Sequence, residues 1–376
     1  MLGDMIGNNA LDDVERLVIK IGTSVLADER LQFDQAFIGQ LARQVAHLRR
    51  QGRDVLVVTS GAIAAGRTAL RLEHRPRTLA EKQAAAAVGQ IHLMRFYRSA
   101  FEHEALDVAQ VLLTHGDFQN RRRFLNARQT LLRLLQLGVV PLINENDTIS
   151  VEEILVGDND NLSALVAALV DADALVLLCD VDGLYTSDPG KDPRAQHIPV
   201  VEDVEQAMAY AQDTHNPGST GGMHTKLEAA QHAAAYGIPT FITHGSALQG
   251  VERLLHGGGK GTLILPRKRL NSRKHWIVHT LKPQGQITVD AGALNALCKE
   301  GKSLLPAGVS AVAGRFGPGD PVDVLGPDAR PFARGLVSYS ALEVERLRGH
   351  QSSEIATILG YKTQDEIIHR NHLVLL

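Results

Sequence analysis

Cysteine and aromatic residues are scarce in this sequence. Only Cys179 and Cys298 occur among 376 residues, and Phe, Trp and Tyr together make up 4%. Two cysteines are too few for a disulfide framework, which excludes the disulfide-stapled class of secreted proteins and predicts a reducing, cytoplasmic location. Because Cys179 lies within an apolar run, we expect it to be a core residue.

The sequence also shows neither the pattern of a membrane segment nor that of a secretory leader. The longest stretch without Asp, Glu, Lys or Arg runs from residue 229 to 251, and His, Gly, Pro and Ser interrupt it. Such a segment cannot span a bilayer, so we expect no membrane partner. The first fifteen residues carry four acidic side chains instead of a basic region followed by an apolar one. The sequence therefore predicts no secretory signal.

The remaining composition is that of an ordinary globular protein. Hydrophobic residues make up 44%, charged residues 22%, and the net charge is −3, which excludes a disordered chain. Residues 1–256 sum to −9, residues 276–376 balance, and residues 257–275 carry six basic side chains and no acidic one. The last segment also holds four glycines and a proline. We therefore predict a linker over 257–275 between domains 1–256 and 276–376.

Buried strands alternate with helical segments in the first domain. Short apolar runs predict strands over Arg16–Gly22, Asp54–Thr59, Val139–Asn144, Ala174–Cys179 and Thr240–Thr243. Apolar spacing predicts a helix over Phe33–Gln51, and segments rich in Ala and Leu precede the last three runs. This alternation predicts an α/β fold with parallel strands and crossover helices. Ligands of such sheets bind beyond the carboxyl ends of the strands.

Residues 276–376 have a different sequence pattern. Short strand-like pieces at Gln286–Val289, Val322–Leu325 and Leu336–Tyr339 are separated by Gly, Pro and Asp. This pattern predicts a small mixed, β-barrel-like domain.

Two glycine-containing loops follow the first two strands. Lys20, at the mouth of its strand beside Gly22, can bring an ammonium group to phosphate oxygens, although a surface lysine at a turn is the commoner explanation. The turn from Thr59 to Gly66 offers free backbone amides for a carboxylate or phosphate, or else serves tight helix packing. A nucleophilic Ser60 is excluded, because the hydrolase elbow needs glycine two residues before and two residues after the serine.

Acidic and amide side chains gather in two further loops, Asn144–Asp147 and Gly157–Asn161. Asp160 or Asn161 could serve as the N-cap of the apolar helix that follows. Capping needs one such residue, however, and a cluster of carboxylates at one sheet edge must face an ammonium group, a metal ion or lysines. The cluster therefore favours a binding site.

A fifth loop, Gly218–Lys226, precedes a predicted helix over Leu227–Tyr236. Adjacent glycines and a lysine at a helix start have the features of a phosphate cradle. It is not a Walker A loop, and the Gly301–Ser303 sequence is not one either, because Ala296 stands where that motif needs glycine.

Other polar residues receive simpler interpretations. Arg121–Arg123 is interpreted as a solvated helix face, with an anion-binding loop as the alternative. The 16 histidines include no pair at a metal-binding spacing.

Taken together, these loops resemble the amino-acid kinase family over nearly the whole chain. The shared motifs occur in order and are Val18–Ser24, Val58–Gly66, Asn144–Asp147, Gly157–Ser163, Gly183–Tyr185 and Thr220–Met223. The tail is similar to a PUA domain through Leu304–Gly308 and Arg334–Leu336. The resemblance implies a three-layer sandwich around a mainly parallel sheet, followed by a small mixed β-barrel-like domain.

Within that family, the motifs resemble the members that act on L-glutamate. This implies ATP-dependent phosphorylation of the glutamate side-chain carboxylate, the first step of proline biosynthesis, with Mg²⁺ carried by the nucleotide and no metal site of the protein. It also implies feedback inhibition by proline and a homo-oligomer.

The resemblance assigns roles residue by residue. Lys20 and Lys226 would contact the transferring phosphoryl group, with Asp158 and Asp160 as organisers of the lysines and of the magnesium nucleotide. The acceptor-binding positions would be Ser60, Gly61, Asp147 and Asn159. The nucleotide site would comprise Lys20, Gly22, Cys179, Asp180, Thr220, Gly221, Gly222, Met223, His224, Thr225 and Lys226. The family often has Thr in place of Cys179 and a small Ser in place of His224.

The chemistry of the reaction agrees with this set of residues. A side-chain carboxylate with a pKa of about 4.3 is ionised at neutral pH, so the acceptor needs no general base. Positive charge must be supplied to the phosphoryl group in flight, and two lysines with Mg²⁺ can supply it. We expect Lys20 and Lys226 to act from opposite ends of that group.

Two alternatives remain open at this stage. Another acceptor, such as aspartate, N-acetylglutamate or UMP, would suit the same fold. An RNA-binding protein led by the tail is the second alternative, although zero net charge in residues 276–376 and few aromatic residues argue against strong RNA binding.

Overall fold

The structure is a computed structural model that describes residues 14–27, 33–149, 159–211, 222–245, 251, 260–266 and 283–376. The chain divides into two compact units, the first ending at Arg269 and the second including Leu270–Leu376. Each unit has its own hydrophobic core.

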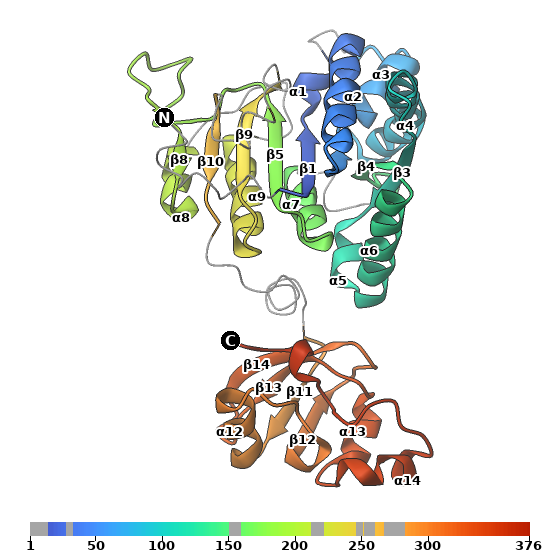
Figure 1. Ribbon diagram of the computed structural model, residues 1–376, viewed down its shortest axis with the longest axis vertical. Helices are drawn as coiled ribbons and strands as arrows, with labels where there is room; N and C mark the ends of the chain where they lie inside the picture. The colour runs from blue at the N-terminus through green and yellow to red at the C-terminus, as the bar shows by residue number, and fades with distance from the viewer. Residues whose placement is uncertain are drawn as a thin grey trace. The chain divides into compact units, whose positions relative to one another are not determined.

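The first unit is built on an eight-stranded sheet with the order β3-β4-β2-β1-β5-β9-β10-β8 (Figure 1). The strands are β1 (Arg16–Ile21), β2 (Asp54–Val58), β3 (Val108–Leu113), β4 (Val140–Glu145), β5 (Ala174–Cys179), β8 (Val200–Val201), β9 (Thr240–His244) and β10 (Thr262–Ile264). A separate ribbon pairs β6 (Leu184–Tyr185) with β7 (His197–Ile198). All pairings of the large sheet are parallel except that of β9 with β10. The predicted α/β fold is confirmed.

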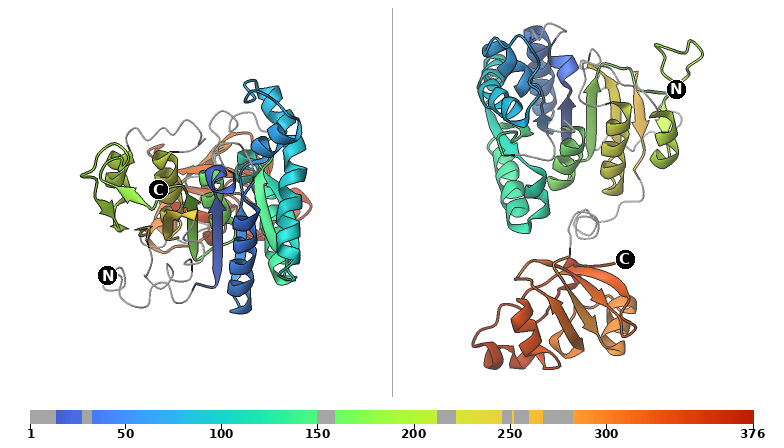
Figure 2. Two further views of the ribbon diagram at one scale, coloured as in Figure 1. Left: turned by 90° about the horizontal axis from the view of Figure 1, so that it is seen from above. Right: turned by 180° about the vertical axis from the view of Figure 1, so that it is seen from behind.

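Helices follow most strands of this unit. They are α1 (Thr23–Leu26), α2 (Gln35–Arg50), α3 (Ala62–Ala69), α4 (Leu79–Glu102), α5 (His115–Gln119), α6 (Arg121–Gln136), α7 (Asn159–Leu169), α8 (Val204–Ala207) and α9 (Met223–Ala235). Helices α2 and α4 lie side by side in the views of Figures 1 and 2. No helix among the described residues is long and apolar enough to cross a membrane.

The alternation of side chains along β1 directs Lys20 to the functional face of the sheet. Leu17, Ile19 and Ile21 pack in the core that includes α2 and α4. Because successive residues of a strand point to opposite faces, Lys20 points to the other face, where α7 packs against β1. The two faces of the sheet are thus covered by different helices, as a three-layer sandwich requires.

The second unit holds a five-stranded mixed sheet with the order β12-β11-β13-β14-β15. Its strands are β11 (Gly285–Val289), β12 (Val309–Gly314), β13 (Pro321–Leu325), β14 (Pro331–Leu336) and β15 (Leu373–Leu375), and its helices are α12 (Ala291–Lys299), α13 (Ala341–Leu347) and α14 (Ile355–Leu359). Only the pairing of β11 with β13 is parallel. The predicted mixed sheet of the tail is confirmed.

Three local predictions were wrong. Residues 262–264, expected in the linker, form β10, because their alternating hydrogen bonds join β9 on one side and β8 on the other. The predicted strand over Leu336–Tyr339 ends at Leu336, where Val337 turns to bond with Asp320. Helix α9 starts at Met223, four residues before the predicted start at Leu227. Residues 257–259 and 267–275 of the expected linker lie outside the described residues.

Candidate active site

The candidate site lies where the carboxyl ends of β1, β2 and β4 meet the first turns of α7 and α9. Lys20 is the fifth residue of β1, and Asp160 is the second residue of α7. Lys226 is the fourth residue of α9. The parallel sheet thus collects residues from distant parts of the chain at one edge, as expected for this fold.

Lys20 and Lys226 converge on one carboxylate. The Lys20 ammonium donates to Asp160 Oδ1, and Lys226 Nζ lies 3.7 Å from Asp160 Oδ2. Both lysine side chains are 8% exposed and the Asp160 side chain is 2% exposed. Together these three side chains carry a net charge of +1. Because a buried net positive charge is unfavourable by itself, an additional anion beside the lysines would be stabilising.

Asp160 is held in place by its own helix and by α9. The Ser163 hydroxyl donates to the Asp160 carbonyl oxygen over 2.5 Å. The Thr225 hydroxyl lies 2.9 Å from Asp160 Oδ2 and 2.9 Å from the carbonyl oxygen of Gly222. Asp160, which the sequence offered as an N-cap, is the second residue of α7, and its carboxylate contacts both lysines.

The pKa of Asp160 reflects these neighbours. Burial alone would raise it, but the charges of Lys20 and Lys226, with hydrogen bonds from Lys20 and Thr225, lower the pKa to about 2. The carboxylate is therefore ionised throughout the range in which the protein would work.

Asn159 links the ends of β2 and β4 beside this cluster. Its Nδ2 donates toward the Thr59 carbonyl oxygen at 2.8 Å, Ser60 Oγ at 2.9 Å and Asn144 Oδ1 at 3.0 Å. Its Oδ1 is buried and has no hydrogen-bond partner in the described part of the chain. A buried carbonyl oxygen without a donor is costly, so this atom marks a place for a donor group of a ligand.

Asn144 is a site residue that the sequence motif contained but that we did not assign. It is 2% exposed at the end of β4, and its Nδ2 donates to Gln90 Oε1 over 2.8 Å. Its Oδ1 also accepts the backbone N–H of Glu145 over 2.9 Å. The available signal was its place at a strand end within the acidic and amide cluster.

Asp147 follows three residues after Asn144, in the turn beyond β4. Desolvation by burial raises its pKa to about 6. A carboxylate with a raised pKa at the edge of such a cluster is characteristic of a functional position. It is half-buried, so a small polar ligand can still reach it.

The other predicted residues take different places. Gly22 precedes α1, and its N–H donates to Leu178 O over 3.1 Å. Gly61 adopts a φ of 95° at the start of α3, a left-handed conformation that favours glycine. Cys179 is buried, as predicted for a core residue, and burial raises the pKa of its thiol to about 11. Asp180 follows β5 and is exposed.

The predicted nucleotide loop is only partly described. Gly222 precedes α9, and Met223 through Lys226 form its first turn. His224 is not brought into the lysine cluster, because its ring faces Glu228, with 3.6 Å between Nδ1 and Oε1, and its side chain is 61% exposed. The remaining predicted positions, Asp158, Thr220 and Gly221, lie outside the described residues.

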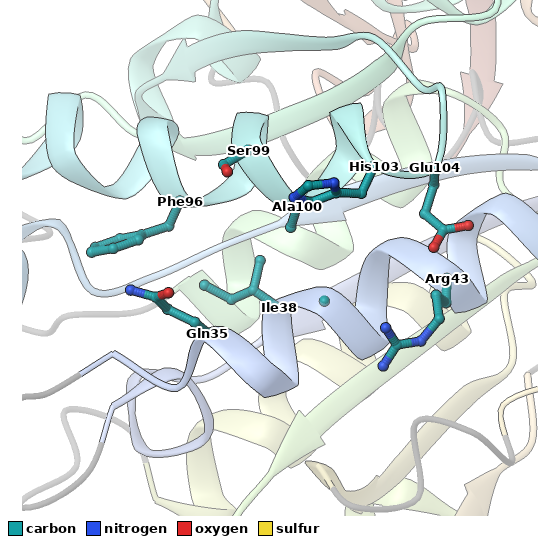
Figure 3. A pocket seen from close by; sticks show the side chains of 9 residues that line it. Gln35, Ile38, Arg43, Phe96, Ser99, Ala100, His103 and Glu104 are labelled. Carbon is teal, nitrogen blue, oxygen red and sulfur yellow. The ribbon is translucent and has the colours of Figure 1, made fainter.

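Arg122 and Arg123 are exposed on α6, as predicted for a solvated helix face. A pocket of about 290 Å³ lies between α2 and α4, and its lining residues include Arg43 and Glu104 (Figure 3). None of its lining residues was predicted as a site residue. The described residues hold no group of three or more His, Cys, Asp or Glu side chains that could bind a metal ion.

Comparison with known proteins agrees with this geometry. Residues 15–244 match the model of the amino acid kinase family, and residues 285–359 match that of the PUA domain. A glutamate 5-kinase of Geobacter sp. (strain M21) is 52% identical over 97% of this chain and 99% of its own length. The glutamate 5-kinase of Moorella thermoacetica is 48% identical over 98% of both chains. The Thermus thermophilus glutamate 5-kinase is 47% identical over 96% of this chain and 97% of its own. The chain therefore belongs to the amino-acid kinase family, among the glutamate 5-kinases.

Proposed function

We propose that this protein transfers the γ-phosphoryl group of ATP to the side-chain carboxylate of L-glutamate, forming L-glutamyl 5-phosphate in the first step of proline biosynthesis. The observation that carries the proposal is the convergence of Lys20 and Lys226 on the two oxygens of Asp160. Two lysines from opposite ends of the first unit meet at one buried point, and the chemistry of phosphoryl transfer needs positive charge at such a point.

Lys20 and Lys226 would hold the transferring group between them. Asp160 keeps both ammonium groups in place when no phosphate is bound, since an unpaired buried charge would be strongly destabilising. When the phosphoryl group arrives, its equatorial oxygens approach the faces of the ammonium groups that Asp160 does not occupy. The low exposure of the three side chains excludes water and strengthens the attraction.

Asn159 and Asp147 would bind the acceptor. The buried Oδ1 of Asn159 offers an acceptor for an N–H of the substrate, and the α-ammonium group of glutamate is such a donor. Asp147, ionised above its pKa of about 6, supplies a negative charge for the same ammonium group. Ser60 and Gly61 lie at the same edge, and the Ser60 hydroxyl already accepts from Asn159. The acceptor carboxylate would then face the lysines.

The first turn of α9 would bind the nucleotide phosphates. Its leading backbone N–H groups have no partners within the helix, and the positive end of the helix dipole favours anions. Mg²⁺ belongs to the nucleotide substrate in this proposal, because Mg²⁺ in such sites is held mainly by substrate phosphates, water and one or two carboxylates. Asp158 is the carboxylate that we assign to this role from the family pattern.

The remaining partners follow from family membership. Proline would inhibit by occupying the acceptor half of the site, since an amino acid held there excludes glutamate. We also propose a homo-oligomer and a cytoplasmic location, the latter supported by two free cysteines. The PUA unit would serve as an interaction or regulatory module, with weak RNA binding at most.

The test is a screen of acceptors with ATP and Mg²⁺. ATP consumption is measured with L-glutamate, L-aspartate, N-acetyl-L-glutamate and UMP, each with and without proline. The proposal expects the highest kcat/KM with glutamate and its decrease in the presence of proline. A clear preference for UMP or for N-acetylglutamate would overturn the assignment of the acceptor.

A further inference from the structure

Gln90 lies outside the predicted site but is joined to it by a buried hydrogen bond. It belongs to α4, is 8% exposed, and accepts the Nδ2 proton of Asn144 at its Oε1. Asn144 in turn accepts from Asn159 Nδ2. The inference below concerns the acceptor half of the site and therefore rests on the proposed function.

The packing of α4 on α3 fixes the position of Gln90. A Cβ placed on Gly89 would lie 1.8 Å from the carbonyl oxygen of Ala62, and one placed on Gly66 would lie 1.7 Å from that of Ala85. The two helices can approach this closely only because both positions are glycine. Gln90 follows directly after the contact, so its backbone has little freedom to move relative to α3.

Two backbone groups determine the orientation of the side-chain amides. The N–H of Glu145 donates to Asn144, so the Asn144 atom that it meets is the oxygen Oδ1. The Thr59 carbonyl oxygen accepts from Asn159, so the Asn159 atom that it meets is the nitrogen Nδ2. A backbone N–H can only donate and a backbone carbonyl can only accept, so neither assignment can be reversed.

Gln90 completes this order. Once Asn144 uses its oxygen for Glu145 and Asn159, its Nδ2 must find an acceptor in the interior, and Gln90 Oε1 is the one it reaches. The flipped amide of Gln90 would place its Nε2 donor beside the Nδ2 donor of Asn144, and the two would repel. The present orientation leaves Gln90 Nε2 buried without a partner in the described part of the chain. One unpaired Nε2 group is thus present in the interior, while every other donor of this chain of hydrogen bonds meets an acceptor.

We infer that Gln90 is a positioning residue for the amino-acid acceptor: by fixing Asn144, it holds Asn159 with its buried oxygen turned toward the substrate ammonium group. Discrimination for an acceptor that carries an α-ammonium group, over one that lacks it, therefore depends on Gln90. The lysine cluster is held by Asp160 and does not depend on it.

The probe is the pair L-glutamate and glutarate, which differ only by the α-amino group. We compare kcat/KM for the two acceptors, at saturating ATP, in the wild-type protein, Gln90→Met and Gln90→Glu. Gln90→Met keeps the length of the side chain and removes the acceptor, whereas Gln90→Glu keeps an acceptor oxygen. Leu93→Val is the matched control, because Leu93 is fully buried on the same helix and lies in the core, outside this chain of hydrogen bonds.

In Gln90→Met we expect the preference for glutamate over glutarate to fall about tenfold, the usual effect of one buried hydrogen bond on binding. KM for ATP should change by less than about twofold. Gln90→Glu should recover most of the preference, and Leu93→Val should leave it unchanged even where it lowers the melting temperature.

A preference in Gln90→Met equal to that of the wild-type protein would overturn the inference, and so would an equal loss in Leu93→Val. The double variant Gln90→Met with Asn144→Ala gives a second check. If Gln90 acts through Asn144, the double variant shows the same preference as Asn144→Ala alone, whereas independent effects would multiply. A wild-type protein that does not phosphorylate glutamate contradicts the proposed function itself, an outcome distinct from an active enzyme with an unchanged preference.

Discussion

Asp160 is a carboxylate buried between two ammonium groups, and its environment differs from that of Asp147. The charges of Lys20 and Lys226 outweigh the effect of burial at Asp160 and lower its pKa to about 2. Burial without a comparable cation raises the pKa of Asp147 to about 6. The pKa values of the two carboxylates thus shift in opposite directions, and perturbed pKa values are common at functional sites. One organises charge, and the other can respond to pH.

Replacing Asp160 should destabilise the fold as well as the site. In Asp160→Asn the two lysines face each other without a carboxylate, and breaking a buried ion pair in this way costs about 3 kcal/mol or more. We expect a lower free energy of unfolding in urea and a loss of ATP-dependent glutamate phosphorylation. Arg98→Ala is the control, because its partner Glu102 is exposed and such pairs contribute little. Equal stability of Asp160→Asn and Arg98→Ala would contradict the role of Asp160.

Asp147 should make glutamate binding depend on pH. In the proposed binding mode its ionised form attracts the α-ammonium group, and with a pKa of about 6 in the free protein this form is lost as the pH falls through 6. We expect KM for glutamate to rise about tenfold per pH unit below that value, with KM for ATP nearly constant. The raised pKa has the opposite effect on stability, which is greatest below the unfolded pKa and decreases as the pH rises through 6.

The measurement for Asp147 is the pH profile of KM for glutamate from pH 5 to 8 in the wild-type protein and in Asp147→Asn. The variant should have a high KM that does not change over this range. A profile in the variant as steep as that of the wild-type protein would show that another group titrates.

Some site residues could be predicted from the sequence, and others could not. Lys20 stands two residues before a glycine at a strand end, and Lys226 follows two glycines at a helix start, so local patterns indicated both residues. Gln90 sits inside an Ala-rich helix, far in the chain from the residues it contacts. Its role depends on the packing of α4 against the sheet, which cannot be predicted from the sequence around Gln90.

At the scale of secondary structure elements, α4 is the support of the acceptor half. Tyr97 lies two helical turns after Gln90, and its hydroxyl is 2.7 Å from Thr59 Oγ1 in the interior. Helix α4 thus contacts both strand ends that Asn159 joins. The contact between α3 and α4 at Gly66 and Gly89 sets the distance between these two helices.

A methyl group at Gly89 should force the two helices apart. Gly89→Ala places a Cβ 1.8 Å from a backbone oxygen, which cannot be relieved without moving a helix. We expect a loss of about 2 kcal/mol or more in the free energy of unfolding. Gly39→Ala on α2 is the matched control, because its nearest atom is 3.8 Å away at the end of an arginine side chain. The control should be neutral or more stable, since alanine favours a helix.

Thermal and urea unfolding of the two glycine variants give the comparison. If Gly89→Ala were as stable as Gly39→Ala, the close approach of α3 and α4 would not restrict position 89.

The elements that sequence reasoning found are those with long apolar runs. Strands β1, β2, β4, β5 and β9 are buried on both faces of a parallel sheet, and their continuous hydrophobic character made them visible. Strand β10 has only three residues and lies within a segment rich in glycine and basic residues. The composition of that segment predicts a linker, so the strand was not predicted. It becomes a strand because β8 and β9 offer hydrogen bonds on both sides.

At the scale of the whole molecule, the two units have separate hydrophobic cores. The core of the first unit includes Val57, and that of the second includes Val324, with no residue in common. Charge distribution predicted two domains, whereas the role of the PUA unit has no signal in the sequence, because its net charge is zero. A role in partner binding would depend on surface shape, which composition does not encode.

Because the cores are separate, we predict that a substitution that unfolds one unit leaves the other unit folded. Val324→Asp buries a charge in the second unit and should remove one part of the thermal transition, while kcat for glutamate stays within about twofold of the wild-type value. Val57→Asp places the same charge in the first unit, where the valine is equally buried, and should abolish activity. Loss of activity in Val324→Asp would show that the kinase unit needs the PUA unit to fold.

In the proposed mechanism, Lys20 and Lys226 together stabilise the phosphoryl group during transfer. The most direct measurement is kcat of Lys226→Ala at saturating ATP and glutamate, with circular dichroism to confirm the fold. Removing one preorganised charge from such a site lowers kcat by about a hundredfold or more, and this is the predicted result. A kcat near that of the wild-type protein would contradict this role of Lys226.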